Sequence, residues 1–264
     1  MIFAGKIVLI VGASSGMGRG VALRLAAEGA TIVATARRVV ELESLATEIA
    51  FNHGVCMIHP ADALCQDEAA AVVAATITRF GRIDLLLMNV GGAPDLDLRT
   101  IGTSAVKDYM RGNYDVCVNY LIPVLDQMMR QNSGMVAHTN SLAGLMGVPL
   151  QGPYSAAKGA MRLLMDTCRI EFADHGIRFV SIYPGFVATA RTQAHDMPSP
   201  FEISEQRGIA HMVRALHTER CNYRFPASIS WLVRVATLLP QPLVTMLLRR
   251  RLRTAREGRP AAPA

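Results

Sequence analysis

The sequence lacks the patterns that mark disulfide-bonded or metal-binding proteins. Its five cysteines are odd in number, widely spaced and without a CxxC pair, so neither a disulfide framework nor a zinc site is indicated. The seven histidines show no spacing typical of metal ligands, and we predict no metal site. Residues 1–5 lack the charged segment and the long apolar stretch of a signal peptide. These absences favour a cytoplasmic protein.

The chain has few charged residues and no general excess of one sign. Charged residues make up 18% of the sequence and hydrophobic residues 51%, a balance that predicts a folded globule with a substantial core. Most of the net charge of +6 comes from six arginines between residues 249 and 259, which only Glu257 opposes there. Because the rest of the chain is nearly neutral, we predict no nucleic-acid partner.

The sequence also lacks an uninterrupted apolar run long enough to cross a membrane. Residues 228–239 and 243–248 are apolar, but two prolines separate them and would break a spanning helix of about 20 residues near its middle. We therefore predict an amphipathic, arginine-rich extension over residues 228–264. Two interpretations stay open. The extension packs against the core or a second subunit, or it lies peripherally on a membrane, with Trp231 in lipid and the arginines on anionic headgroups.

A regular alternation of strand and helix patterns occupies the rest of the chain. Short apolar runs rich in β-branched residues are typical of strands buried on both faces, and segments with helical spacing of apolar residues lie between them. The alternation predicts one α/β domain over residues 1–227, a doubly wound parallel sheet of the Rossmann type. The expected strands are residues 7–11, 31–35, 55–59, 83–88, 134–139 and 177–183. The expected helices are residues 19–28, 40–51, 66–80, 104–131 and 154–175, with further helices beyond.

A glycine-rich turn joins the first expected strand to the first helix. Residues 12–18 read Gly-Ala-Ser-Ser-Gly-Met-Gly, which permits a tight turn and a close approach of the backbone to a pyrophosphate at the helix N-terminus. The spacing G-x-x-x-G-x-G resembles the turn of short-chain dehydrogenases, although that family usually has threonine where this chain has Val11. The resemblance implies a nicotinamide cofactor and hydride transfer.

The end of the second expected strand indicates which nicotinamide cofactor binds. An acid there accepts hydrogen bonds from a ribose 2′-hydroxyl, whereas a basic residue accommodates a 2′-phosphate. This chain has Arg37 and Arg38 and no acid, so we predict NADP(H). Arg37 is the first candidate for the phosphate partner, Arg38 is the second, and Ser14 is a candidate hydroxyl donor. The alternative is that both arginines are merely solvated at a helix entrance.

The resemblance implies further cofactor contacts. Asp62 follows the third strand at the position of the family aspartate that meets the adenine. Residues 88–91 read Met-Asn-Val-Gly, which keeps half of the family's Asn-Asn-Ala-Gly, and Pro184 to Thr189 resembles its Pro-Gly segment. The expected cofactor residues are Gly12, Ser14, Ser15, Gly16, Met17, Gly18, Arg37, Arg38, Asp62, Asn89, Gly91, Tyr154, Lys158, Pro184, Gly185, Val187 and Thr189.

Tyr154 and Lys158 are four residues apart at the start of an expected helix, and therefore on one face of it. A tyrosine has an ordinary pKa near about 10, and we expect the positive charges of Lys158 and an oxidised nicotinamide to lower it toward the working range. Tyr154 can then exchange a proton with a substrate oxygen. Ser141 lies thirteen residues earlier and resembles the family's catalytic serine, whose hydroxyl holds the carbonyl oxygen.

A fourth catalytic residue is implied by the resemblance. Asn113 resembles the family asparagine that holds a water next to the active lysine, and Asn119 is the competing choice. Asn113 is favoured because it lies forty-one residues before Tyr154. Without the resemblance, it is an ordinary polar residue in a long helix.

These residues predict an NADP-dependent oxidoreductase that interconverts a carbonyl and an alcohol and forms a homo-oligomer, either a dimer or a tetramer. The expected substrate region comprises residues 92–99 and 142–151 with a lid near residues 186–209, and its apolar side chains favour a hydrophobic ketone or aldehyde. Asn113-Tyr114 and the apolar C-terminal region also resemble ketosphinganine reductases, which suggests a lipid-like ketone. The alternative from another class is a nucleotide-binding regulatory protein without turnover. A hydrolase is disfavoured because no Gly-x-Ser-x-Gly elbow occurs.

Overall fold

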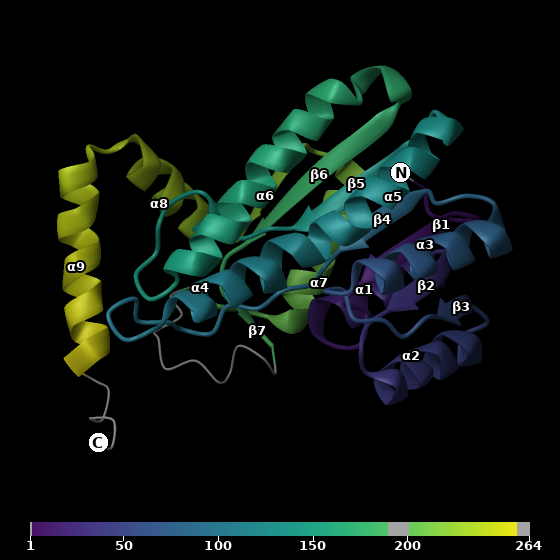
Figure 1. Cartoon of the computed structure of the whole chain (residues 1–264), viewed down its shortest axis with the longest axis horizontal. Helices are drawn as coiled ribbons and strands as arrows, with labels where there is room; N and C mark the ends of the chain where they lie inside the picture. The colour runs from purple at the N-terminus through teal and green to yellow at the C-terminus, as the bar shows by residue number, and fades with distance from the viewer. Residues whose placement is uncertain (1, 190–200, 258–264) are drawn as a thin grey trace.

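A seven-stranded parallel sheet forms the centre of the molecule (Figure 1). The computed structural model describes residues 2–189 and 201–257. The strand order is β3-β2-β1-β4-β5-β6-β9, with the chain reversing direction across the sheet between β1 and β4. The strands are β1 (Ile7–Val11), β2 (Thr31–Thr35), β3 (Val55–Ile58), β4 (Leu85–Met88), β5 (Gly134–Thr139), β6 (Ile177–Pro184) and β9 (Asn222–Phe225). The predicted doubly wound parallel sheet is confirmed.

Helices cover both faces of this sheet. One core cluster lies under α1 (Gly16–Ala27), α2 (Val39–Phe51) and α7 (Glu205–Thr218). The other lies under α3 (Gln66–Phe80), α5 (Val116–Gln131) and α6 (Gly152–Glu171). Because successive side chains of a strand point to opposite faces, Val8 and Ile10 enter the first cluster while Leu9 and Val11 enter the second. This two-sided burial explains the continuous apolar runs.

The expected helix over residues 104–131 has an irregular turn. It consists of α4 (Thr103–Met110), a π-helical turn (Arg111–Asp115) and α5 without a break between them. Such a turn inserts an extra residue into the helical ladder and shifts the side-chain register, and it is frequent at functional sites. The periodicity of apolar residues does not reveal it.

A strand beyond residue 183 was missed. The expectation of helices alone in that region is wrong, because β9 pairs in parallel with β6 at the sheet edge. Its sequence, Asn-Tyr-Arg-Phe, is polar at two of four positions, and only Phe225 is buried. An edge strand lacks the apolar run that marks the central strands. A second, two-stranded sheet pairs β7 (Val187–Ala188) with β8 (Ile203–Ser204).

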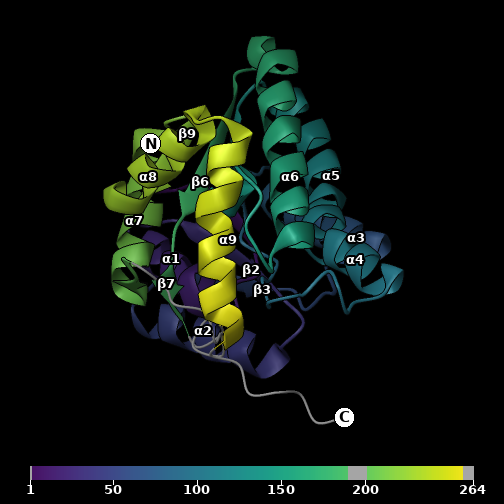
Figure 2. The ribbon, with the colours of Figure 1, turned by 90° about the vertical axis from the view of Figure 1, so that its left-hand side faces the viewer.

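The C-terminal part forms two helices, α8 (Ala227–Leu238) and α9 (Gln241–Glu257). The break falls at Leu239–Pro240, where the prolines predicted an interruption. Among the described residues, no helix has the length and apolar character needed to span a membrane. In Figures 1 and 2, α9 stands at the outer edge of the molecule.

Asp84 ties the start of β4 to the start of β1. Its carboxylate accepts hydrogen bonds from the Ile7 N–H (2.9 Å) and from the Arg82 side chain (2.5 and 3.0 Å), and it pairs with Lys6 (3.3 Å). Burial raises the pKa of Asp84, but the hydrogen bonds from Arg82 and Ile7 and the two positive charges outweigh burial and hold the pKa below its ordinary value. The ionised carboxylate therefore stabilises the folded state.

Asp84→Ala is expected to lower the free energy of unfolding by about 1–3 kcal/mol, because the Ile7 N–H loses its acceptor. The contribution of Asp84 is present above the ordinary pKa of 3.8 and is lost as the pH falls through the lower folded pKa. Urea unfolding at pH 7 measures the difference. Glu48→Ala, which removes an exposed ion pair with Arg19, is the matched control and should cost less than about 1 kcal/mol. Equal costs would contradict the role of Asp84.

Candidate active site

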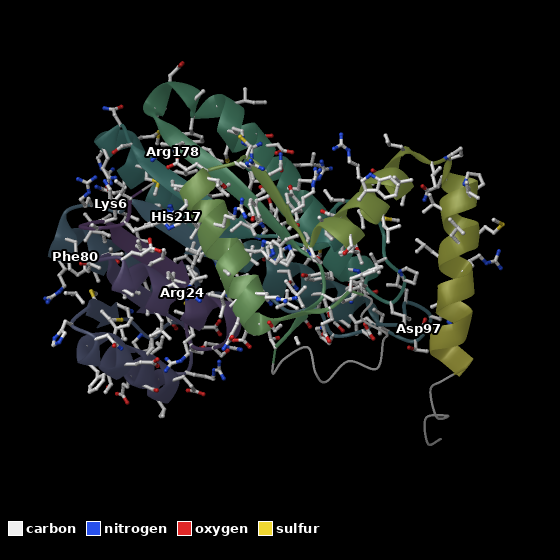
Figure 3. All side chains as sticks on the ribbon, turned by 180° about the vertical axis from the view of Figure 1, so that it is seen from behind. Lys6, Arg24, Phe80, Asp97, Arg178 and His217 are labelled. Carbon is white, nitrogen blue, oxygen red and sulfur yellow. The ribbon has the colours of Figure 1, made fainter. Side chains whose placement is uncertain are left out.

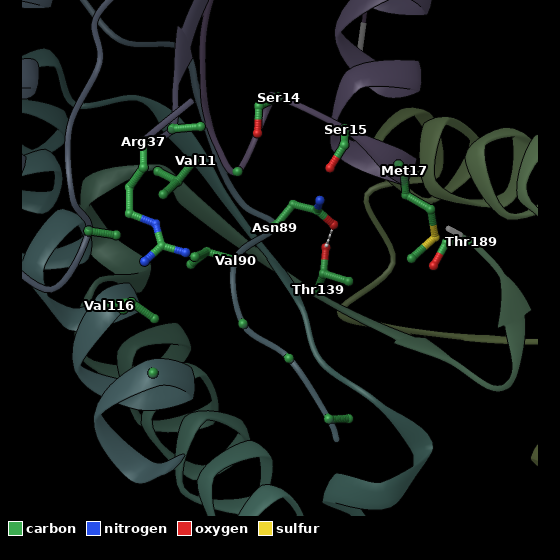
Figure 4. Close-up of a pocket in the computed structure, with 18 of the residues that line it drawn as sticks. Val11, Ser14, Ser15, Met17, Arg37, Asn89, Val90, Val116, Thr139 and Thr189 are labelled. Carbon is green, nitrogen blue, oxygen red and sulfur yellow. Dashed lines mark hydrogen bonds between the residues drawn. The ribbon is translucent and has the colours of Figure 1, made fainter. Parts of the chain in front are cut away.

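A cavity of about 530 Å³ opens at the carboxyl ends of the parallel strands. In open α/β sheets, ligands bind at this edge where the strand order reverses, here between β1 and β4. Figure 4 shows that the glycine turn, the loop after β4 and the end of β2 face one another around this cavity. Of the residues predicted from the sequence, the cavity is lined by Gly12, Ser14, Ser15, Gly16, Met17, Arg37, Arg38, Asp62, Asn89, Gly91, Ser141, Tyr154, Lys158, Pro184, Gly185, Val187 and Thr189.

The glycine turn leaves no space for side chains at two of its positions. A Cβ on Gly12 would lie 2.3 Å from the Asn89 carbonyl oxygen, and the residue has φ +86°. A Cβ on Gly18 would lie 2.2 Å from the carbonyl oxygen of Gly12. Gly18 is therefore a packing residue of the turn rather than part of the cavity wall. The turn brings backbone N–H groups and the N-terminus of α1 to the cavity, which suits a pyrophosphate. These residues fit a dinucleotide.

The two arginines after β2 are arranged differently from each other. The Arg38 guanidinium donates to the hydroxyls of Ser14 (2.9 Å) and Ser15 (2.6 Å) and pairs with Glu41 (3.3 Å). Arg37 extends across the cavity toward Val90 (Figure 4). Arg38, the second candidate from the sequence, is therefore the arginine next to the glycine turn. Both arginines line the cavity, and their contact with a 2′-phosphate stays a prediction.

Asn89 connects the ends of the central strands. The side-chain oxygen of Asn89 accepts a hydrogen bond from the Thr139 hydroxyl (2.9 Å), and the backbone N–H of Asn89 donates to the Val11 carbonyl (2.9 Å). The dashed line in Figure 4 marks the first of these bonds. Asp62 caps its own loop by accepting from the Leu64 N–H (3.0 Å), and it faces the cavity. The half-preserved segment at 88–91 thus still holds β4 beside β5.

Ser141 and Tyr154 meet at the inner end of the cavity. Ser141 follows β5, and its hydroxyl accepts from the Ala143 N–H (3.1 Å) and hydrogen-bonds Tyr154. Tyr154 stands in the first turn of α6. The Ser141 oxygen accepts the backbone hydrogen bond, and its own proton is available for donation to the tyrosine oxygen. A substrate oxygen placed between the two hydroxyls would accept from both.

Lys158 lies one helical turn beyond Tyr154 and is buried. Its ammonium donates to the Thr139 carbonyl (2.9 Å) and lies 5.7 Å from the centre of the Tyr154 ring. Burial lowers the pKa of Lys158 and raises that of Tyr154, while the Ser141 hydrogen bond opposes the latter shift. Among the protein groups burial is the largest cause and raises this pKa, and the lowering expected once an oxidised nicotinamide adds its charge stays a prediction. The protein holds Tyr154 as a neutral phenol, the form that donates a proton.

The structure separates the two asparagine candidates. Asn113 is buried in the π-helical turn, where its side chain accepts from the Gly92 N–H (3.0 Å) and donates to the Tyr109 carbonyl (3.1 Å). Asn119 instead donates to the carbonyls of Ala63 (2.9 Å) and Leu64 (3.4 Å) beyond β3. Asn113 thus holds the loop after β4 and lies in a turn that packs against α6, and its catalytic role stays a prediction. It does not itself line the cavity.

Asn140 and Tyr109 are among the residues at or near the cavity that were not predicted from the sequence. Asn140 accepts from the Ser141 N–H (2.8 Å) and donates to the Lys158 carbonyl (3.0 Å), so its side chain joins the serine segment to α6. Tyr109 donates to the Pro94 carbonyl and lies close enough to Tyr154 to interact with it electrostatically. Neither carries a sequence signal that separates it from other polar residues. The part of the expected lid from residue 190 to 200 lies outside the described residues.

Comparisons with known proteins agree with this geometry. The family model described as short chain dehydrogenase matches residues 6–198. An uncharacterized oxidoreductase of Listeria monocytogenes is 35% identical over 72% of this chain and 77% of its own length. One of Myxococcus xanthus is 30% identical over 93% of this chain and 97% of its own. A 3-oxoacyl-[acyl-carrier-protein] reductase of Synechocystis is 32% identical over 71% of this chain and 76% of its own.

The fold and the relatives define an oxidoreductase with a nicotinamide-dinucleotide site. Among solved structures, an alcohol dehydrogenase of Thermococcus sibiricus complexed with 5-hydroxy-NADP has a TM-score of 0.74 and 25% identity, with 83% of this chain and 95% of that one covered. The chain belongs to the short-chain dehydrogenase family. Members act on small molecules with NAD(P)(H) and commonly form oligomers.

Proposed function

We propose that this protein uses NADPH to reduce a hydrophobic ketone or aldehyde, or oxidises the corresponding secondary alcohol with NADP⁺. The observation that carries the proposal is one cavity that has Ser141, Tyr154, Lys158, Arg37 and Arg38 among its lining residues. The bound cofactor supplies or accepts the hydride. In the direction of reduction, Ser141 and Tyr154 hold the carbonyl oxygen, and Tyr154 donates its proton to that oxygen.

Lys158 and Asn113 support this proton transfer in our proposal. The buried ammonium of Lys158 is fixed by the Thr139 carbonyl and is placed to bind a ribose hydroxyl next to Tyr154. Asn113 holds the Gly92 backbone beside the nicotinamide end of the cavity. The remaining predicted cofactor residues, including Pro184, Gly185 and Thr189, form the wall around that end.

Apolar side chains favour a hydrophobic substrate. Leu145, Met146 and Val148 are only partly buried and follow Ser141 directly. The backbone of this segment is fixed, because the Leu150 carbonyl accepts from the Leu96 N–H (2.7 Å) and the Ser155 hydroxyl accepts from the Val148 N–H (3.3 Å). These three residues are not among those that line the cavity, and we propose that the apolar portion of a bound substrate lies against them while the polar pair holds the oxygen.

A spectrophotometric assay of the purified protein tests the proposal. Absorbance of NADPH and of NADH is followed with a panel of aliphatic and aromatic ketones and aldehydes, and binding of both cofactors is measured by calorimetry. We expect turnover of apolar carbonyls with NADPH in preference to NADH. Cofactor binding without turnover of any carbonyl or alcohol would instead favour the nucleotide-binding regulatory protein, and a preference for NADH would contradict the cofactor assignment.

The two arginines are expected to select NADPH. Arg38→Ala should weaken NADPH binding by roughly 10–100-fold, as expected for a hydrogen bond to a charged group worth about 1.5–3 kcal/mol, and should leave NADH binding nearly unchanged. Arg37→Ala should act in the same direction. Arg24→Ala, at an exposed position of α1 that Figure 3 labels, is the matched control. Equal loss of NADPH and NADH affinity in both variants would contradict a 2′-phosphate contact.

A further inference from the structure

The two C-terminal helices expose apolar side chains that a folded monomer normally buries. Trp231 is 66% exposed and Leu238 81% exposed on α8, and Leu247 is 47% exposed on α9. We define the C-terminal surface as the exposed apolar residues of α8 and α9, which are Trp231, Leu232, Leu238, Leu243, Met246 and Leu247. Exposed apolar residues gathered on consecutive elements mark an interaction site more often than isolated ones.

The other side of α9 is already used within the molecule. Val244 is 6% exposed, and Leu248 and Leu252, which follow at intervals of one helical turn, are partly buried. Leu243, Met246 and Leu247 therefore face away from the covered side. Figure 2 shows α9 as the element nearest the viewer, with no other described element in front of it. The α9 residues of the C-terminal surface therefore lie on the outside of the helix and do not belong to an incompletely packed core.

A strong charge asymmetry accompanies this surface. Residues 220–256 contain eight arginines and no acid, whereas the rest of the chain contains nineteen basic and twenty-one acidic residues. Five of the eight arginines follow the exposed stripe within α9, at positions 249, 250, 251, 253 and 256. An apolar stripe followed by a dense positive charge complements a lipid surface with anionic headgroups.

We propose that α8 and α9 bind the surface of an anionic membrane, with the C-terminal surface in the interface and the arginines of α9 on the headgroups. A two-fold contact between copies of this chain would place the same patch on both partners. That contact would offer the arginine clusters no opposite charge, because α8 and α9 contain no acid before Glu257. A membrane supplies the missing negative charge and covers the apolar stripe at the same time.

The base of α8 connects this surface to the cavity. A Cβ on Gly185 would lie 2.8 Å from Ile229 and 3.4 Å from Leu142, so the first turn of α8 packs on the segment that lines the cavity wall. Binding through α8 and α9 therefore positions the body of the enzyme, with its cavity, at the membrane surface.

Trp231 is the only tryptophan of the chain, so its fluorescence reports on the proposed interface alone. The full-length protein is titrated with vesicles of phosphatidylcholine and with vesicles that also contain phosphatidylglycerol. We expect a blue shift of the emission and co-sedimentation with the anionic vesicles, weakened by high salt, and little of either with phosphatidylcholine alone. Absence of binding to anionic vesicles overturns the proposal. An emission that shifts with protein concentration in the absence of lipid also overturns it, because a second copy then covers the surface.

Paired variants separate the contribution of the apolar side chains to membrane binding from that of the arginines. Leu243→Ser with Leu247→Ser, and Arg249→Gln with Arg253→Gln, should each weaken partitioning into anionic vesicles on the order of tenfold or more. Phe51→Ser, which removes an 84% exposed apolar side chain from α2, is the control and should bind as the parent does. Unchanged NADPH affinity in all three confirms that they are folded. Parental vesicle binding by either paired variant contradicts the proposal.

Discussion

Tyr154→Phe is expected to reduce turnover by about 10²–10⁴-fold, the usual contribution of a positioned proton donor. The substitution keeps the aromatic ring between Ser141 and Lys158 and removes only the hydroxyl. Affinity for NADPH should stay within a fewfold of that of the parent protein, because the substitution leaves the glycine turn and the arginines of the cavity unchanged. Single-turnover kinetics with NADPH and an accepted carbonyl, together with calorimetry, separate these quantities.

Tyr223→Phe provides the matched control for the loss of a phenol. The Tyr223 hydroxyl contacts His211 (3.2 Å) between β9 and α7, and this residue does not line the cavity. It should keep parental turnover. A Tyr154→Phe enzyme that also keeps most of its turnover would show that another group supplies the proton, and the catalytic assignment would be wrong.

The residues predicted most accurately are those whose positions are fixed by backbone geometry. At positions 12 and 18, Asn89 and the turn itself leave no room for a Cβ. Because only glycine lacks this atom, the spacing of the two glycines predicts the turn from the sequence. Tyr154 and Lys158 are one helical turn apart, and that distance is local. The predicted bounds of β1, β2 and β5 are confirmed because these strands are buried and apolar.

Contacts between distant segments could not be read in the same way. Arg38 rather than Arg37 reaches Ser14 because of the path that the backbone takes from β2 to α2. A shift of one residue in this turn would exchange the two side chains, and the sequence does not show it. The position of Asn140 against Lys158 depends on packing between β5 and α6. The direction of the Tyr154 pKa shift within the protein depends on burial, which sequence spacing does not reveal.

Ser141→Ala is expected to lower turnover by roughly 10²–10³-fold, the cost of losing one donor to an oxygen that gains negative charge. Its oxygen accepts the Ala143 N–H, and its hydroxyl bonds Tyr154, so the variant removes a donor directed at the reacting oxygen. The loss should appear in kcat and kcat/KM together, since the interaction strengthens in the transition state. Steady-state kinetics with the best carbonyl of the panel measure it.

Ser155→Ala makes the matched comparison, since this serine is adjacent to Tyr154 in the sequence but serves a different contact. Its hydroxyl accepts from the Val148 N–H and holds residues 142–151 of the expected substrate region, so its removal should change KM more than kcat. Ser141→Thr, which restores a hydroxyl, should recover part of the lost rate. Turnover of Ser141→Ala at the parental rate, with unchanged NADPH affinity, would contradict the catalytic role. Ser141 would then serve only as the cap of the turn at residues 142–144, where its side chain accepts from the Ala143 N–H.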